Sequence, residues 1–384
     1  MRKLAATGNP IVKKNIVIFL VDFFAKSNLK NYFDKFFAMV QELSADDGTL
    51  VKYYTLDVIS SIIGKNSNKE YQQISFEILS TYLSLGYWRL NYGFIKNFRA
   101  LGKLWVNNRD DESLVGEYMK YLRSESKEVQ LIALEHIPEL VDIVEFNKCK
   151  KPLVELLKQL IATEPGLKRI SIQQLFVFIH NEENEQQKQY LTSYLLDLLE
   201  RSDNGTKLFI MLQFDDLTRM LTVEKAVKMI LDNLGAHYES FGYEERLEAV
   251  KVVRNLLEID KIFENEEFYQ LAKTRILADR FFKVRIGFVE AIGEVEDLVD
   301  KRTLEKIVLP LFTDFLTNAD HKLRTNVIIF MAEKRFRLGE DKLSKMASTL
   351  IAMNTKDSND FKWMSHQVLS DIRERTSRKN LKVS

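Results

Sequence analysis

Histidine and cysteine are the side chains most able to support catalysis or bind a metal ion, and both are rare in this sequence of 384 residues. The histidines are His136, His180, His237, His321 and His366. No two stand three or four residues apart, the spacing that places two zinc ligands on one face of a helix. We therefore expect no metal site. His136 directly precedes a position of a repeating apolar pattern, and we interpret it as a structural histidine.

The sequence also lacks the common catalytic motifs. No nucleophile elbow, phosphate-binding loop or dinucleotide-binding glycine triplet is present. Cys149, the single cysteine, has no histidine near it in the sequence, so we expect an inert thiol in a reducing compartment. The carboxylate runs at 181–186 and 264–267 are typical of solvated turns and helix starts. The sequence therefore predicts a protein that is not an enzyme and has no cofactor.

Composition narrows the possible partners. Basic and acidic residues number 56 and 55, which argues against the broad basic surface of a nucleic-acid-binding protein. The most apolar run, residues 16–25, contains Asp22 and is about half the length of a membrane span. We expect a soluble, cytoplasmic protein without membrane insertion, for which nuclear or cytoskeletal association stays open.

A repeat of 39 residues organises the chain. One position, called the anchor, recurs every 39 residues, or twice after 38, and is apolar in most copies. The anchors are Val12, Val51, Leu90, Val129, Leu167, Thr206, Glu245, Val284, Leu323 and Phe361. A basic residue follows most anchors, and the position eight residues after the anchor is apolar in every copy. This periodicity is typical of helical repeat proteins.

The segment before each anchor repeats as well. The position eleven residues upstream is apolar or aromatic in all but one of the copies that have it. The exception is Lys273, which predicts a shifted or irregular helix before Val284. Each copy thus reads as a first helix (helix A), a short intra-repeat turn and a second helix (helix B) that starts at the anchor, as in 31–43 followed by 50–63.

A single helix pair of this length cannot bury its apolar faces, but a stack of pairs can. The predicted fold is therefore all-α: one α-solenoid of about ten 39-residue helix pairs over residues 1–384, with a tail at about 375–384. The first pair has no helix A before Val12, so we expect another chain to cover the stripe at 16–24.

The helix pairs resemble HEAT repeats, and three stretches resemble the scaffold (A) subunit of protein phosphatase 2A. These stretches are 86–98, 308–333 and 361–372. That family often carries Trp-Arg-Val-Arg-Tyr in its turns; Trp88, Arg89, Leu90 and Tyr92 match this string, and Asn91 departs from it. The family has fifteen repeats, and this chain has about ten.

The resemblance implies a non-catalytic scaffold whose intra-repeat turns bind a Ser/Thr phosphatase catalytic subunit and a regulatory subunit or larger assembly. It places the regulatory edge at Tyr87, Trp88 and Arg89. By position, it places the catalytic-subunit edge at Phe241, Tyr243, Phe281, Phe282, Lys283, His321, Lys322, Asp360 and Trp363. Aromatic residues on turns are enriched at binding hot spots, although such rings can instead fold back into the core.

Two alternatives to phosphatase binding remain. One is a structural HEAT-repeat subunit of a large assembly, and the other is a transport-receptor-like adaptor that binds peptides. The basic residues after the anchors also have two interpretations. They can pair with turn carboxylates such as Asp46 and Asp279, each five residues before an anchor, or they can form a cationic ridge for an acidic partner.

Overall fold

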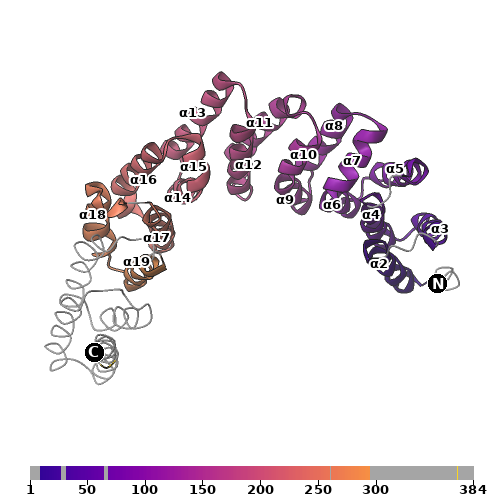
Figure 1. Cartoon of the computed structure of the whole chain (residues 1–384), viewed down its shortest axis with the longest axis horizontal. Coiled ribbons are helices and arrows are strands. Elements are labelled where there is room, and N and C mark those ends of the chain that lie inside the picture. The colour runs from indigo at the N-terminus through magenta and orange to yellow at the C-terminus, as the bar shows by residue number, and fades with distance from the viewer. Residues whose placement is uncertain (1–8, 27–31, 65–67, 260, 295–369, 371–384) are drawn as a thin grey trace, which may run out of the picture. The chain divides into compact units, whose positions relative to one another are not determined.

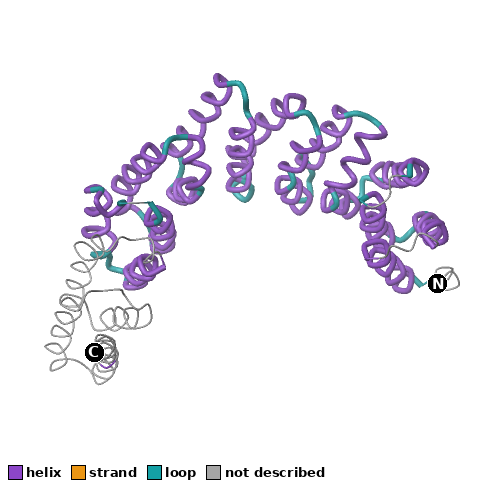
Figure 2. The backbone as a smooth tube through the Cα atoms, viewed as in Figure 1, coloured by secondary structure: helices purple, strands orange, loops and turns teal. Residues whose placement is uncertain are grey.

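A computed structural model describes residues 9–26, 32–64, 68–259, 261–294 and 370. These residues form eighteen α-helices and no β-strand, which confirms the all-α prediction (Figures 1 and 2). The chain divides into two compact units, residues 1–193 and 194–384, and each is described by itself. One continuous solenoid over the whole chain stays a prediction.

The first unit alternates helices A and B as the repeat predicts. Its A helices are α3 (Phe33–Ser44), α5 (Lys69–Ser84), α8 (Asp111–Leu122) and α11 (Phe146–Thr163). Its B helices are α2 (Pro10–Lys26), α4 (Thr49–Ile63), α6 (Trp88–Lys96) with α7 (Phe98–Asn108), α9 (Lys127–Glu135) with α10 (Ile137–Ile143), and α12 (Lys168–Asn181). The B helices pack in sequence, α2 on α4, α4 on α6, α6 on α9 and α9 on α12.

The second unit continues the alternation. Its A helices are α16 (Val223–His237) and α18 (Glu266–Leu271), and α13 (Glu185–Arg201) spans the boundary between the two units. Its described B helices are α14 (Asn204–Leu212) with α15 (Phe214–Met220), α17 (Tyr243–Leu257) and α19 (Phe282–Glu294). Short helical turns are η2 (Tyr238–Ser240), η3 (Ile262–Glu264) and the π-helix η4 (Ala272–Ile276). α14 packs on α17, α17 on α19, and α16 on α18.

The anchors mark the starts of the B helices. Helix B begins two residues before the anchor in every described pair except the fifth, where the anchor Leu167 is the N-cap of α12. The position eight residues later lies in the core: Leu20, Ile59, Phe98, Ile137, Leu175, Val253 and Ile292 are buried, and Phe214 is half-buried. The anchors Leu323 and Phe361 lie outside the described residues.

The positions eleven residues before the anchors form the other half of the core. Val40, Leu79, Tyr118, Leu156, Leu195 and Leu234 are all buried. Lys273 is exposed and lies in η4, where hydrogen bonds of the wider π type interrupt the helix. The prediction of an irregular helix before Val284 is therefore confirmed.

Three B helices break at the seventh residue after the anchor, a feature that the repeat did not predict. The break residues are Asn97, His136 and Gln213. The Asn97 Nδ2 and His136 Nδ1 atoms lie 3.0 and 2.9 Å from the carbonyl oxygens four residues earlier. Gln213 Nε2 makes the equivalent contact at 3.5 Å. A side chain that contacts this carbonyl competes with the helical backbone, which favours a bend, and His136 is a structural histidine as predicted.

Helix α2 is apolar on two sides. Its inner side, with Leu20 and Phe24, packs into a cluster with α3 and α4, whereas Ile11, Ile18 and Phe19 are exposed. Much of the stripe at 16–24, for which we expected a covering chain, is thus buried against α3 and α4 of this chain. That another chain covers its exposed members, Ile18 and Phe19, stays a prediction.

Candidate protein-binding surface on the intra-repeat turns

The turn between α5 and α6 presents a group of exposed apolar side chains that includes two predicted site residues, Tyr87 and Trp88. α5 ends at Ser84, and Gly86 adopts a left-handed conformation with φ of 68°, which favours glycine. The Gly86 amide donates to the Leu83 carbonyl at 3.1 Å and closes the turn. The chain then enters α6 at Trp88.

The side chains of this turn point into solvent. Tyr87 and Trp88 are 50% and 45% exposed, and Leu85 is exposed beside them. The Arg89 guanidinium lies over the Trp88 ring, 4.7 Å from its centroid, which is the geometry of a cation–π contact. The turn therefore places an aromatic pair and a cation together on the surface. Leu85 was not singled out from the sequence, although it lies next to Gly86.

The turns of the second unit divide the predicted residues between surface and interior. Phe241 is 2% exposed and packs beside Tyr238, with ring centroids 6.0 Å apart. It is not on the surface, because η2 folds the turn back over the core. Tyr243 and Phe281 are half-buried and meet edge to face at 5.0 Å across neighbouring turns.

Phe282 and Lys283 are exposed at the start of α19. Together with Tyr243 and Phe281 they form a group on two adjacent turns of the second unit. His321, Lys322, Asp360 and Trp363 lie outside the described residues. The structure thus brings together Tyr87 to Arg89 in one unit and Tyr243 with Phe281 to Lys283 in the other.

In two places the basic residue that follows an anchor pairs with an aspartate of the next intra-repeat turn. This aspartate stands five residues before the next anchor. Arg246 Nη1 lies 2.6 Å from Asp279 Oδ2, and the two side chains are 7% and 0% exposed. Lys13 pairs in the same way with Asp46, at 22% and 12% exposure. In both turns the second carboxylate oxygen accepts the amide hydrogen two residues later, at 2.8 Å. The prediction that basic residues after the anchors pair with Asp46 and Asp279 is confirmed, and in both cases the cation comes from the preceding repeat.

These contacts change the ionisation of the groups involved. Burial alone would raise the pKa of Asp46, but the hydrogen bonds from Lys13 and the Gly48 amide, with the nearby positive charges, lower it below its usual value. Burial raises the pKa of the Tyr238 hydroxyl, which donates to Asp279 Oδ2 at 3.0 Å, and the Asp279 charge raises it further.

The residues that directly follow the anchors are called the basic column, and in other copies of the repeat they have different partners. Lys207 is buried and its ammonium nitrogen lies 2.9 Å from His237 Nε2, because Ser240 occupies the place five residues before the next anchor. Gln130 donates to the Leu122 carbonyl at 3.2 Å. The buried members of the column are thus structural and do not form a cationic ridge.

The remaining candidates for chemistry lie in structural settings. Cys149 is buried, and burial raises the pKa of its thiol to about 11. Within the described ranges, no three His, Cys, Asp or Glu side chains are grouped so that they could hold a metal ion. In the same part of the chain, no helix combines the length and the apolar sequence that a bilayer crossing requires.

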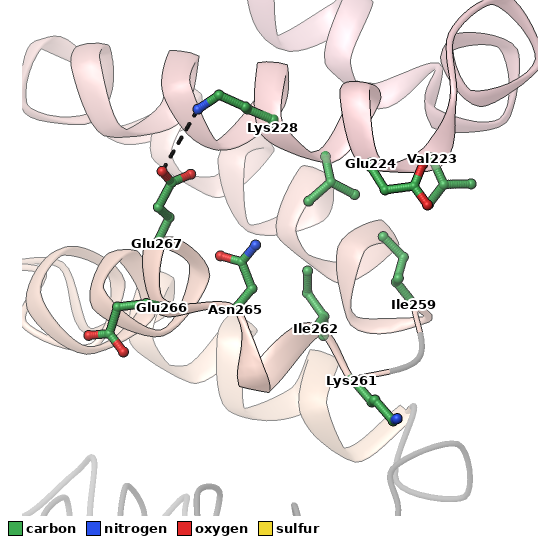
Figure 3. A pocket seen from close by; sticks show the side chains of 10 residues that line it. Val223, Glu224, Lys228, Ile259, Lys261, Ile262, Asn265, Glu266 and Glu267 are labelled. Carbon is green, nitrogen blue, oxygen red and sulfur yellow. Dashed lines mark ion pairs between the residues drawn. The ribbon is translucent and has the colours of Figure 1, made fainter.

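One hollow in the second unit has no counterpart in the sequence prediction. It has a volume of about 560 Å³ and lies between the start of α16 and the connection from α17 to α18 (Figure 3). The residues that line it come from two neighbouring pairs, so no single repeat carried a signal for it.

Stacked helix pairs with a buried column in each helix define an α-solenoid of HEAT-like repeats. No protein-family model matches the chain, and no curated protein matches it in sequence. Among solved structures, importin beta, crystallised in an ammonium sulfate condition, aligns at a TM-score of 0.59 and 11% identity over 96% of this chain and 50% of that chain. Kap121p aligns at 0.50 and 11% identity over 96% of this chain and 46% of that chain. The chain therefore spans about half the length of these two proteins, which it resembles in fold.

Proposed function

We propose that this chain is a non-catalytic scaffold that binds partner proteins through its intra-repeat turns. The observation that carries the proposal is the turn at 85–89, where Leu85, Tyr87 and Trp88 are exposed together and Arg89 covers one face of the tryptophan. Aromatic and arginine side chains dominate the energetics of protein interfaces. A monomer has no stabilising reason to expose them side by side on a turn.

The mechanism we propose is positional. A solenoid that holds two partners raises the effective concentration of one near the other and fixes their relative geometry. The fold likeness to importin beta and Kap121p supports a transport-receptor-like adaptor or a structural subunit of an assembly more than it supports the phosphatase scaffold.

A phosphatase scaffold remains the second candidate because of one observation. The string Trp88-Arg89-Leu90-Asn91-Tyr92, which resembles the turn motif of that family, forms the start of α6, and its first two residues, Trp88 and Arg89, are exposed. The group at Tyr243 and Phe281 to Lys283 would then belong to the edge that binds the catalytic subunit.

Co-purification of the tagged full-length chain from native extract, with quantitative mass spectrometry, tests the proposal. One variant combines Tyr87→Ala with Trp88→Ala, and another combines Phe282→Ala with Lys283→Ala. Tyr190→Ala is the matched control, since Tyr190 is 56% exposed but lies on a helix. All three variants should melt like the wild type, because exposed positions contribute little to stability.

Partners lost from a turn variant and kept by the control would support the scaffold. Loss of a Ser/Thr phosphatase catalytic subunit from the Phe282 and Lys283 variant would favour the second candidate. If both turn variants keep every partner that the wild type binds, the turns are not the binding surface.

A further inference from the structure

The hollow beside α16 lies at the opposite end of the helices from the intra-repeat turns. It is lined by the first two turns of α16 and by the segment between α17 and α18 together with the start of α18 (Figure 3). The lining residues of that second segment are Ile259, Lys261, Ile262, Asn265, Glu266 and Glu267. Both segments lie where a helix B passes into the next helix A. The hollow is therefore separate from the surface of the proposed function, and a ligand can bind there whether or not the turns bind partners.

The long connection explains why the fold leaves space here. Between α15 and α16 the chain crosses from helix B to helix A through residues 221 and 222, but between α17 and α18 it needs residues 258–265. Within that connection Lys261 adopts a left-handed conformation with φ of 60°, which is rare for a side chain with a Cβ atom, and η3 follows it. α18 then starts late and is short, so Val223 at the start of α16 stays 43% exposed.

Four apolar side chains line the hollow, and together we call them its floor. Val223 and Val227 come from α16, while Ile259 and Ile262 come from the connection. A volume of about 560 Å³ is within the range of natural ligand sites, roughly 300–1,000 Å³. The hollow can thus accept a side chain with an extended apolar part.

The rim is acidic. Glu224, Glu266 and Glu267 line it, and of these only Glu267 forms an ion pair with a described residue, Lys228, whose Nζ lies at 3.8 Å. Glu266 accepts a hydrogen bond from the Gln270 amide at 2.7 Å, and its charge is not neutralised by this contact. Neither Glu224 nor Glu266 forms an ion pair with the described part of the chain.

The two lysines of the rim do not balance these charges. Lys228 also pairs with Asp232 at 3.3 Å and so is shared between two carboxylates. Lys261 extends away from the other labelled side chains in Figure 3. The open part of the rim therefore carries an excess of negative charge next to an apolar floor.

We propose that this hollow binds a lysine or arginine side chain from a basic segment of a protein partner. The alkyl stem of such a side chain would lie on the valine and isoleucine floor, and its cationic head would reach the carboxylates of Glu224 and Glu266. An acidic side chain would be repelled by the same rim, and a purely apolar one would leave the carboxylates without a counter-charge. Arginine fits best, because its planar guanidinium is weakly hydrated and donates to two acceptors.

Methyl-detected NMR of the full chain can test this directly, because Val223, Val227, Ile259 and Ile262 supply probes on the floor. The ligand is a seven-residue peptide with one arginine between two leucines, and the matched ligand carries the neutral isostere citrulline instead of arginine. We expect the arginine peptide to shift these methyl signals and to bind about fivefold more tightly than the citrulline peptide, which is the scale of partly solvated ion pairs. The preference should shrink as salt is raised.

Variants identify the carboxylates responsible. Glu224→Gln and Glu266→Gln should each weaken binding of the arginine peptide about two- to fivefold. Glu200→Gln, which removes an exposed carboxylate of α13 outside the hollow, should leave it unchanged. All three substitutions are at surface positions, so the folded chain is retained for the comparison.

Three results would overturn the proposal. One is equal binding of the arginine and citrulline peptides, which would make the hollow an apolar site only. Another is binding that leaves the floor methyl signals in place, which would put the site elsewhere. The third is the absence of any shift at millimolar peptide.

Discussion

Removal of the Asp279 carboxylate, which pairs with Arg246, should destabilise the chain more than removal of the Asp46 carboxylate, which pairs with Lys13. Asp279→Ala would leave the Arg246 guanidinium, which is 7% exposed, with only the 62% exposed Glu239 carboxylate at 3.7 Å as a counter-ion in the described part of the chain. It would also remove the acceptor of the Tyr238 hydroxyl and of the Phe281 amide. Loss of one partner from a buried ion pair lowers the free energy of unfolding by about 3–5 kcal/mol, because the remaining charge stays desolvated.

The equivalent aspartate in the first unit is an internal control. Asp46 makes the same two kinds of contact, with Lys13 and with the Gly48 amide, but the lysine is 22% exposed and can turn to water. Asp46→Ala should therefore destabilise by only about 1 kcal/mol. The two substitutions are chemically identical, so their difference reports the deeper burial of the Arg246 pair together with the Tyr238 hydrogen bond that only Asp279 accepts.

Hydrogen exchange with mass spectrometry is the suitable assay, because a solenoid opens locally and a single global melting temperature averages over many repeats. For Asp279→Ala we expect the protection of peptides from α17 and α19 to fall between about 10²-fold and about 4,000-fold. For Asp46→Ala we expect a fall of about fivefold in α2 and α4.

The result that would refute the reasoning is an equal or larger effect of Asp46→Ala. A double variant tests the mechanism further. Arg246→Met combined with Asp279→Leu removes both charges, so its effect should be smaller than that of Asp279→Ala alone. If the double variant were as unstable as the single one, lost packing would be the cause instead of an unpaired charge.

The other predictions concern single positions. The pKa of Asp46 is lower in the folded chain than its usual 3.8, so its carboxylate stabilises the fold above that pH and ceases to do so as the pH falls below it. The difference in stability between the wild type and Asp46→Asn, measured by urea titration, should therefore be full at pH 6 and vanish in acid. Ser240→Asp would restore the missing carboxylate beside Lys207, and we expect urea denaturation to show a gain of about 1 kcal/mol; a loss would mean that the turn cannot orient the new side chain. Ile292→Asp places a charge at a position that is 1% exposed, so circular dichroism melting should report a loss of about 3 kcal/mol or more, and a wild-type melt would contradict the inward orientation of this column. Cys149 should react with iodoacetamide at pH 8 only as fast as the chain opens, since burial raises its thiol pKa to about 11; rapid alkylation of the native chain would show an accessible thiol.

The repeat architecture could be predicted from the sequence because burial in a solenoid repeats with the helix pair. Each B helix faces the same neighbours, so an apolar side chain such as Ile59 or Val253 is required at the same place in every copy. Even the failure of the pattern at Lys273 was informative. A lysine in a core column requires either a shifted helix or an unpaired buried charge, and the π-helix supplies the shift.

The exposure of turn residues could not be predicted in the same way. Phe241 and Trp88 both lie close to a helix B start, and both are aromatic. Phe241 is buried because η2 turns it towards Tyr238, whereas Gly86 directs the other turn away from the core. A backbone conformation of one or two residues decides the outcome, and the repeat period contains no information about it. The hollow beside α16 was missed for a related reason, since it results from the length of one connection.

The basic column has one part that the repeat predicts and another that depends on a single turn residue. Arg246 with Asp279 and Lys13 with Asp46 show that a cation after one anchor and an aspartate five residues before the next meet across the stack. Lys207 represents the case in which only the cation is present, and it remains buried and contacts an imidazole nitrogen instead. The fold therefore determines where each basic side chain points, while the identity of one residue in the next turn determines whether it forms an ion pair. Ion pairing between neighbouring repeats can accordingly differ from turn to turn without any change in the register of the helices, and the stability of the stack should be uneven along the chain.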